Sequence, residues 1–364
     1  MSSTSQAERY YVASQWQLMR RKFRSHRLAV GGLVLLAIFY GVAVFAEFFA
    51  QTGPKQYDVA LKHHPPQRPR LFHEGRLQRP FVYFTSGSTD LLSGFRSYRE
   101  DRSRPLPIRL FVRGSEYRLL GLIPGNVHLF GVEEGHFFPF GTNEIGRDVY
   151  SLNVYAARVS LSVGFVGVLL SFLLGCILGG ISGYYGGSVD MVIQRFIDFL
   201  ISLPQIPLWM AFAAVLPSSW TSVQRYFAIT IILSIFGWAG LARVVRGWLL
   251  ATRQADFVLA ARLAGAREPA VVVRHLLPSF LSYLIVSLTL SVPAMILGET
   301  ALSFLGVGIR PPAVSWGTML ADAQNVTTLF LYPWLLVPGI FVIVAVLAFN
   351  FVGDGLRDAA DPYM

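Results

Sequence analysis

The chain has 364 residues, of which 53% are hydrophobic and only 14% are charged, and its formal net charge is +10. A soluble domain carries about a quarter charged residues, so this composition excludes an ordinary soluble protein and indicates a membrane protein. The arginines flank apolar stretches and form no basic face with interleaved aromatic residues, which argues against nucleic acid as a partner. We therefore expect an all-α polytopic fold that has the lipid bilayer as its surroundings.

The N-terminal segment, residues 1–27, ends in the basic stretch "SQWQLMRRKFRSHR", in which Trp16, Met19 and Phe23 fall at helical spacing. This pattern is typical of an amphipathic helix on the cytoplasmic membrane surface. A disordered tail with a basic stop signal is the alternative. The apolar run that follows, 28–48, is longer than the core of a cleavable signal peptide, so we predict an uncleaved first transmembrane helix.

Residues 49–157 have a different character, with proline- and arginine-rich stretches and strand-like runs such as "YRLLGLIPGNVHLFGV". We predict a small β-containing insertion in the aqueous space outside the membrane, followed by the segment that leads into the second span. Its histidines, His63, His64 and His73, match no trusted metal-ligand spacing. We interpret them as solvated loop residues.

Apolar segments long enough to cross a bilayer, which takes about 20 residues, occur six times. They are 28–48, 158–182, 192–216, 226–247, 277–304 and 333–353. The last five make up a core, residues 158–355, which precedes a short tail at 356–364. The span 192–216 is the weakest of the six, because two prolines interrupt it.

The arginines predict the orientation of these spans. The connection 248–276 is rich in arginine, whereas 217–225 contains only Arg225 and 305–332 contains only Arg310. Short arginine-rich connections stay in the cytoplasm, so we place 248–276 there and the long segment 49–157 outside. An even number of spans then leaves both termini cytoplasmic.

A series of glycines marks the second span: Gly175, Gly179 and Gly183 lie four residues apart, and Gly187 continues the spacing. In a helix this places them on one face, where two backbones can approach closely. We predict a helix-packing face, which is either static or able to slide. Cys176 is the one cysteine of the chain, so it forms no internal disulfide and is interpreted as a small packing residue.

Few ionisable residues lie within the predicted spans. Glu299, near the outer end of the fifth span, and Arg195 and Asp198, which could pair on one face of the third, are the candidates for a pathway or gate. No lysine follows a glycine, so the chain has no phosphate-binding loop, and it shows no catalytic motif. We expect no enzymatic site, no metal and no cofactor in this chain, and an energy source on a partner.

One arginine-rich stretch, "FVLAARLAGAREPAVVVRHLLP", resembles the EAA loop of ABC-transporter permeases. Leu259-Ala260-Ala261 occupies the position of the triplet, Gly265 that of the glycine, and Leu277-Pro278 the end of the motif. Leu259 replaces the family glutamate and His275 replaces the usual hydrophobic residue. Both departures are similar to the oligopeptide/dipeptide branch of the family.

Further stretches resemble motifs of the same branch, in the same order. They are "FGTNEIGRDVYSLNVYAARVSLSVG", "GYYGGSVDMVIQRFIDFLISLP", "ETALSFLGVGIRPPAVSWGTMLADAQ" and "GDGLRDAADP". Asn143 stands where the branch has aspartate, and Asn153 where it has arginine. The resemblance covers about 1–50 and 137–364, whereas 51–136 is longer than in typical members.

The resemblance implies the fold of a type I ABC importer permease in a bacterial inner membrane. The chain would be the C-type subunit, would pair with a homologous B-type permease, and would form half of the translocation pathway. Two ABC ATPase subunits would bind ATP and Mg on the cytoplasmic side. An external binding protein would deliver the oligopeptide or dipeptide substrate.

The resemblance also assigns the connection 248–276 to ATPase coupling. We expect a short helix over "DFVLAARLA", a turn at a glycine and a return to the membrane at a proline, which together make a rigid element for an ATPase to push. The coupling residues expected are Asp256, Ala260, Ala261, Arg262, Gly265, His275 and Pro278.

Other readings of the sequence stay open. Within the same branch, the substrate could be nickel, an opine, an oligosaccharide or a cell-wall peptide. Outside it, the chain could be a self-sufficient channel or secondary carrier, or a membrane-anchored sensor. Co-purification with ATPases and a second permease distinguishes the importer from both.

Overall fold

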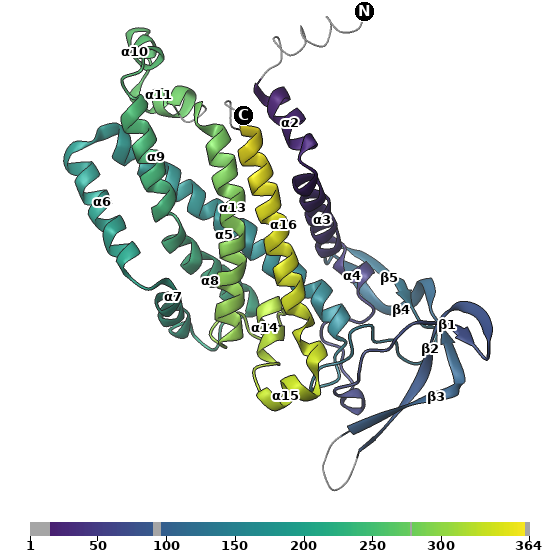
Figure 1. Ribbon diagram of the computed structural model, residues 1–364. Coiled ribbons are helices and arrows are strands. Elements are labelled where there is room, and N and C mark those ends of the chain that lie inside the picture. The colour runs from purple at the N-terminus through teal and green to yellow at the C-terminus, as the bar shows by residue number, and fades with distance from the viewer. Residues whose placement is uncertain (1–14, 90–95, 277–278, 361–364) are drawn as a thin grey trace, which may run out of the picture.

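The computed structural model describes residues 15–89, 96–276 and 279–360. Long helices stand side by side in a bundle, and a small group of strands extends from one end of it (Figure 1). Within the described residues, five helices are long and apolar enough to cross a membrane, and a bent helix pair can supply a sixth span. The all-α polytopic fold that the sequence predicts is thereby confirmed.

Two helices open the described chain, α2 (Gln15–Ser25) and α3 (Arg27–Val44). They meet at His26, whose Nδ1 accepts the N–H of Ala29 at 3.1 Å and caps α3. Met19 of α2 is buried, and the Ser282 hydroxyl donates to its sulfur at 3.5 Å. The helix predicted here is thus present and packs on the end of the bundle through Met19, whereas Trp16 is 53% exposed.

A β module, which we define as residues 50–148, follows the short helix α4 (Ala46–Phe49). Three strands form an antiparallel sheet in the order β1-β2-β3, and two further strands form the antiparallel hairpin β4–β5. The elements are η1 (Val59–Leu61), β1 (Arg70–His73), β2 (Arg76–Thr89), β3 (Arg96–Pro107), β4 (Arg109–Leu119) and β5 (Ile123–Gly131). The predicted β content of the insertion is confirmed.

One histidine of the β module differs from the prediction of solvated loop residues. His64 is fully buried, and its Nδ1 donates to the carbonyl of Pro65 at 2.7 Å while the Thr85 hydroxyl donates to its Nε2 at 2.6 Å. Burial is tolerated because both ring nitrogens have partners. His63 stacks on a tyrosine ring, and His73 is hydrogen-bonded to a tyrosine hydroxyl.

Acidification is expected to loosen the β module through His64. Burial lowers the pKa of His64 to about 4. The neutral ring therefore contributes stability that is fully present above the unfolded-state pKa of about 6.5 and is lost as pH falls toward 4, by at most about 3 kcal/mol. Hydrogen exchange of the β2 amides, followed from pH 7 to 4, measures this. His64→Gln should exchange faster at pH 7 and lose much of the pH dependence; an unchanged pH dependence would contradict the assignment.

The helix α5 (Val149–Tyr185) begins earlier than the predicted span 158–182, inside the segment 49–157. Its start is fixed by Asp148, whose carboxylate accepts the backbone N–H groups of Tyr150 and Ser151 at 3.1 and 3.0 Å. This is an N-cap, which satisfies donors that have no partner within the helix. α5 consequently connects the β module to the far end of the bundle.

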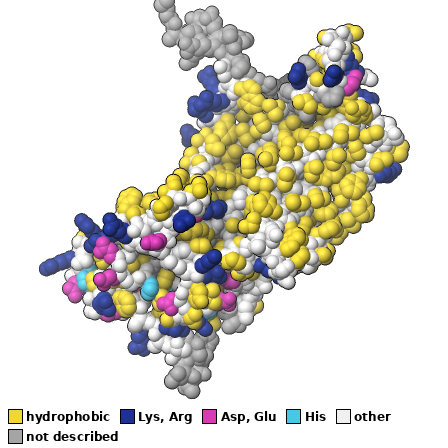
Figure 2. Space-filling view, turned by 180° about the vertical axis from the view of Figure 1, so that it is seen from behind, with side chains coloured by type: hydrophobic (Ala, Val, Ile, Leu, Met, Phe, Trp, Pro, Cys, Tyr) yellow, Lys and Arg dark blue, Asp and Glu magenta, His cyan; other side chains and the backbone are white. Residues whose placement is uncertain are grey.

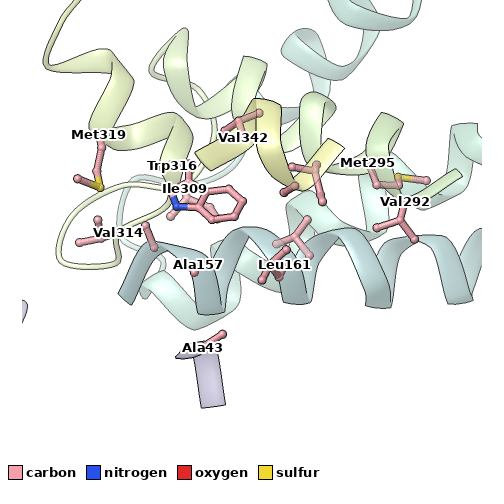
Figure 3. Close-up of a cluster of buried hydrophobic side chains, with 14 of the residues drawn as sticks. Ala43, Ala157, Leu161, Val292, Met295, Ile309, Val314, Trp316, Met319 and Val342 are labelled. Carbon is pink, nitrogen blue, oxygen red and sulfur yellow. The ribbon is translucent and has the colours of Figure 1, made fainter. Parts of the chain in front are cut away.

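The remaining long helices surround α5. They and their connecting turns are α8 (Ser222–Gly237), α9 (Ala239–Thr252), α13 (Leu281–Phe304), α14 (Trp316–Ala321), α15 (Val326–Leu331), η3 (Pro333–Leu336) and α16 (Val337–Ala360). Trp316 of α14 is fully buried in a core cluster to which α3, α5, α13 and α16 contribute (Figure 3). Trp316 thus anchors the short helix α14 in the core at one end of the bundle.

The predicted span 192–216 is not one helix. It is divided into α6 (Gly187–Ser202) and α7 (Gln205–Ala214), which are bent by 88°. Leu203, between them, has an extended backbone with φ −86° and ψ 137°. A residue that precedes a proline is pushed out of the helical region, and Pro204 follows it, so the sequence breaks the helix here.

The outer surface of the helices is apolar. Figure 2 shows apolar side chains covering the helical part of one face, while charged side chains gather on the β module and at the opposite end of the bundle. Such a belt between two polar ends is the surface expected in contact with lipid chains.

Candidate functional site

The predicted coupling segment lies at the end of the bundle opposite the β module (Figure 1). It consists of α10 (Asp256–Leu263), α11 (Glu268–Val271) and the π-helical turn η2 (Val272–Leu276). The carboxylate of Asp256 lies in the first turn of α10, where a negative charge is favoured by the helix dipole. A short helix, a turn and a return toward the bundle are thus present in this connection.

The turn after α10 depends on Gly265, which has φ +83°. Its N–H donates to the carbonyl of Arg262 at 2.9 Å, and the N–H of Ala266 donates to the carbonyl of Ala261 at 3.1 Å. This pair of bonds is the Schellman motif, in which a left-handed glycine ends a helix. A Cβ at this position would meet no atom within 4 Å, so the constraint is backbone conformation and not space.

The inner face of α10 packs against the bundle. Val258 is fully buried with Leu249 and Leu276, and Ala261 is half-buried against the same cluster. Arg262 donates to the Tyr184 hydroxyl at 2.9 Å, and its guanidinium lies over the Tyr184 ring. Two of the expected coupling residues, Ala261 and Arg262, therefore hold α10 in place from inside.

The opposite face of α10 is apolar and exposed. Leu263 is 90% exposed, and Phe257 and Leu259 are 45% and 44% exposed. Ala260 lies between them and is exposed as well. Large apolar side chains gathered on a short helix at the polar end of a bundle are typical of a protein-binding surface. The side chain of His275 and all of Pro278 lie outside the described residues.

Charged residues tie α5, α6 and α9 together near this segment. Arg246 of α9 forms a two-pronged ion pair with Asp190 of α6, with Nη2 2.5 Å from Oδ2. The Ser182 hydroxyl of α5 donates to the same carboxylate at 2.5 Å, and the Gln194 amide donates to Ser182 at 3.0 Å. The sequence does not predict the Asp190–Arg246 pair, because the two residues are far apart in the chain and share no spacing pattern.

The predicted pair Arg195 and Asp198 is present on α6, with Nη1 and Oδ2 3.9 Å apart. Asp198 also accepts a shorter hydrogen bond from Arg243 of α9. The Arg195 side chain is 82% exposed, so this pair contributes little to stability. Both residues of this pair therefore lie on the surface of α6, and Asp198 also faces α9.

The predicted glycine face of α5 packs against α9. A Cβ at Gly179 would lie 2.5 Å from the carbonyl oxygen of Ala242, and one at Gly183 would lie 2.7 Å from that of Arg246. Gly175 faces a leucine side chain of α9. Cys176 packs against the apolar cluster that contains Leu249, Val258 and Leu276. Close backbone approach on this face is therefore a feature of the structure.

Gly187 does not belong to the glycine face, although it continues the four-residue spacing. α5 ends at Tyr185, and Gly187 is the first residue of α6, where its φ is +59°. A four-residue spacing places glycines on one face only while the helix continues, and α5 has ended before Gly187. Since α9 leads into the coupling segment, the shorter glycine face sets the position from which α10 projects.

Glu299 of α13 is fully buried and lies among polar partners. Ser303 donates to its carboxylate at 2.7 Å and Ser160 of α5 at 3.1 Å. The Ser160 hydroxyl in turn accepts the backbone N–H of Trp316 at 3.1 Å. In this conformation the carboxylate joins α5, α13 and α14.

A cavity of about 270 Å³ lies at the end of the bundle that carries the β module. Arg147 and Arg310 line it together with Asp322, so charges of both signs face one space. Burial raises the pKa of Asp322, whose carboxylate also accepts the side-chain amide of Asn143 at 3.3 Å. Asn143 and Arg147 precede α5, whereas Arg310 and Asp322 follow α13. No sequence pattern predicted that these residues meet.

A bundle of membrane-length helices with an apolar outer surface defines an integral membrane protein. Residues 171–364 match the family of binding-protein-dependent transport system inner membrane components. Residues 14–66 match the N-terminal TM domain of oligopeptide transport permease C. The chain belongs to the binding-protein-dependent transport system inner membrane components, and the recognition made from its motifs is confirmed.

Curated relatives agree with this membership. The dipeptide transport system permease protein DppC of Bacillus subtilis (strain 168) is 41% identical over 225 residues, which are 61% of this chain and 68% of the relative. The oligopeptide transport system permease protein OppC of Haemophilus influenzae is 40% identical over 230 residues, 63% of this chain and 71% of the relative. An inward-facing structure of the MetNI methionine ABC transporter is 20% identical with a TM-score of 0.45, covering 57% of this chain and 96% of that one.

Proposed function

We propose that the chain is the transmembrane permease subunit of an ATP-driven importer of oligopeptides or dipeptides, and that it forms half of the translocation pathway. The observation that carries this proposal is the membership of both the N-terminal part and the core in the permease family, together with relatives named as dipeptide and oligopeptide permeases. The partners would be a homologous B-type permease, two ABC ATPase subunits and an external binding protein. ATP and Mg would be bound by the ATPase subunits.

Coupling to an ATPase would use the exposed face of α10. Leu263 and Ala260 would enter a groove of the ATPase, while Val258 and Arg262 keep the helix attached to the bundle. A helix held by packing, by hydrogen bonds and by a Schellman turn moves as a unit with the helices beneath it. Motion of the ATPase would then reach α9 and, through the glycine face, α5.

The coupling role requires α10 in the cytoplasm, so the β module and the cavity near Asp322 would face the outside. Both termini would be cytoplasmic, as the arginine distribution indicates. In a chain with Cys176 replaced by serine, a cysteine at Ser88 in the β module should react with an impermeant maleimide in intact spheroplasts. Labelling only after the membrane is opened would reverse the orientation.

The substrate class is tested by uptake. Cells that lack this chain should lose uptake of labelled di- or oligopeptides, and the tagged chain should recover it and co-purify with ATPases and a second permease. Loss of nickel, opine or oligosaccharide uptake with peptide uptake intact would assign another substrate of the same branch. Recovery of uptake by the chain without any ATPase would favour the self-sufficient carrier.

A further inference from the structure

The tip of the β4–β5 hairpin has unusual chemistry for a turn in water. Residues Leu119–Ile123 read "LLGLI", and the described turn exposes Leu120 by 55%, Leu122 by 81% and Ile123 by 63%. Tight hairpin turns in water favour asparagine, aspartate and glycine, which tolerate positive φ and hydrate well. Here Leu120 itself has φ +50°, a conformation that is unfavourable for a residue with a Cβ.

The tip is fixed beside the end of the first membrane-length helix. The backbone N–H of Leu120 lies close to the carboxylate of Glu47 in α4. The Phe111 ring of β4 contacts the Phe48 ring, with centroids 6.2 Å apart, and His128 of β5 donates to the carbonyl of Ala50 at 2.5 Å. These contacts define where the hairpin lies, next to α4 (Figure 1).

The position of Leu120 beside Glu47 places the tip at the level where α3 leaves the apolar belt. Arg158 of α5 binds the Glu47 carboxylate at 2.7 Å and also donates to the carbonyls of Ala43 and Val44, the last residues of α3. Val44 and Phe45 point outward and are 42% and 47% exposed. In Figure 2, apolar side chains gather on the edge of the β module where it meets the apolar belt of the helices.

The residues on the module side of the tip suit a lipid headgroup region. Arg118 is exposed and directly precedes the turn, Arg113 is exposed in the same strand, and Tyr117 is half-buried between them. At membrane–water boundaries, arginine and tyrosine side chains lie near the lipid phosphates and apolar side chains lie deeper in the bilayer. The hairpin has the same order, with the tyrosine and arginines in the strand and the leucine and isoleucine side chains at the tip.

We propose that the tip of the β4–β5 hairpin, residues Leu119–Ile123, inserts into the adjacent leaflet of the bilayer and holds the β module against the membrane. Lipid is favoured over a protein partner because the tip continues the exposed apolar surface of α3. It also lies beside Glu47, which follows the end of that helix. Insertion accounts for leucine side chains in a turn that would otherwise favour polar residues. The proposal requires only that α3 spans the membrane and is independent of the substrate.

The test compares two fluorescent probes in the full chain with Cys176 replaced by serine. An NBD group is attached to Leu122→Cys or, as a matched control, to Leu77→Cys, which is 70% exposed at the β1–β2 turn away from α4. Each chain is placed in nanodiscs of phosphatidylcholine and phosphatidylglycerol, with or without 5-doxyl phosphatidylcholine. Both positions are exposed, so neither label disturbs packing within the chain.

The probe at Leu122→Cys should show blue-shifted emission, quenching by 5-doxyl lipid and protection from aqueous iodide. The probe at Leu77→Cys should show the reverse. Equal iodide quenching of both probes, without quenching by doxyl lipid at Leu122→Cys, would overturn the proposal. Protection of the Leu122→Cys probe from both quenchers would also overturn it, because the tip would then be covered by protein.

Discussion

Leu263→Asp is expected to abolish ATP-driven uptake while leaving the chain folded. Leu263 is 90% exposed, so the substitution removes little packing within the chain. In the assembled transporter it would place a charge in an apolar contact. Loss of a central apolar contact of this kind costs about 2 kcal/mol or more, which is roughly 30-fold in affinity for the ATPase. The measurement is ATPase recruitment, stimulated hydrolysis and uptake in the reconstituted complex.

Gln254→Glu is the matched control for Leu263→Asp, because it adds the same charge in the preceding turn, where the residue is exposed and already polar. It should leave recruitment and uptake unchanged. Gly265→Asp should share the defect of Leu263→Asp for another reason, since φ +83° disfavours a residue with a Cβ by about 1–2 kcal/mol and would redirect α10. Wild-type recruitment and uptake in both Leu263→Asp and Gly265→Asp would show that α10 is not the coupling element.

Gly179→Ala is expected to destabilise the folded chain by about 3 kcal/mol, despite adding one methyl group. That methyl would lie 2.5 Å from the carbonyl oxygen of Ala242 and 2.8 Å from its Cα. Both are backbone atoms, so no side chain can move aside, and α9 has to shift. The measurement is the thermal unfolding of the purified chain in detergent, together with the amount of folded chain recovered from membranes.

Gly180→Ala provides the comparison on the same helix. Its Cβ would have Val272 as its nearest neighbour, at 4.0 Å, so the methyl fits. Alanine is favoured over glycine inside a helix by up to about 1 kcal/mol, and this variant should be as stable as the wild type or slightly more so. Equal unfolding temperatures for Gly179→Ala and Gly180→Ala would show that α5 and α9 are less tightly packed than described.

The coupling segment shows which structural features its sequence motif predicted and which it did not. Its spacing identified Gly265 as the turn, because a glycine in the left-handed region is a property of the local backbone. The roles of Ala260 and Ala261 did not follow from the motif. Both are small and adjacent, yet Ala260 is exposed while Ala261 is half-buried, and only the packing of α10 on the bundle distinguishes them.

The sequence by itself determined the membrane class, the number and order of the apolar segments, the β insertion and the family. Each of these depends on composition, on local periodicity or on motifs within one stretch of chain. Tertiary structure alone decided that Asp190 pairs with Arg246 and that Glu299 joins three elements. It also brought the hairpin tip to the end of α3. These features require residues far apart in the chain to meet, and the free energy of such contacts depends on distances that no local pattern encodes.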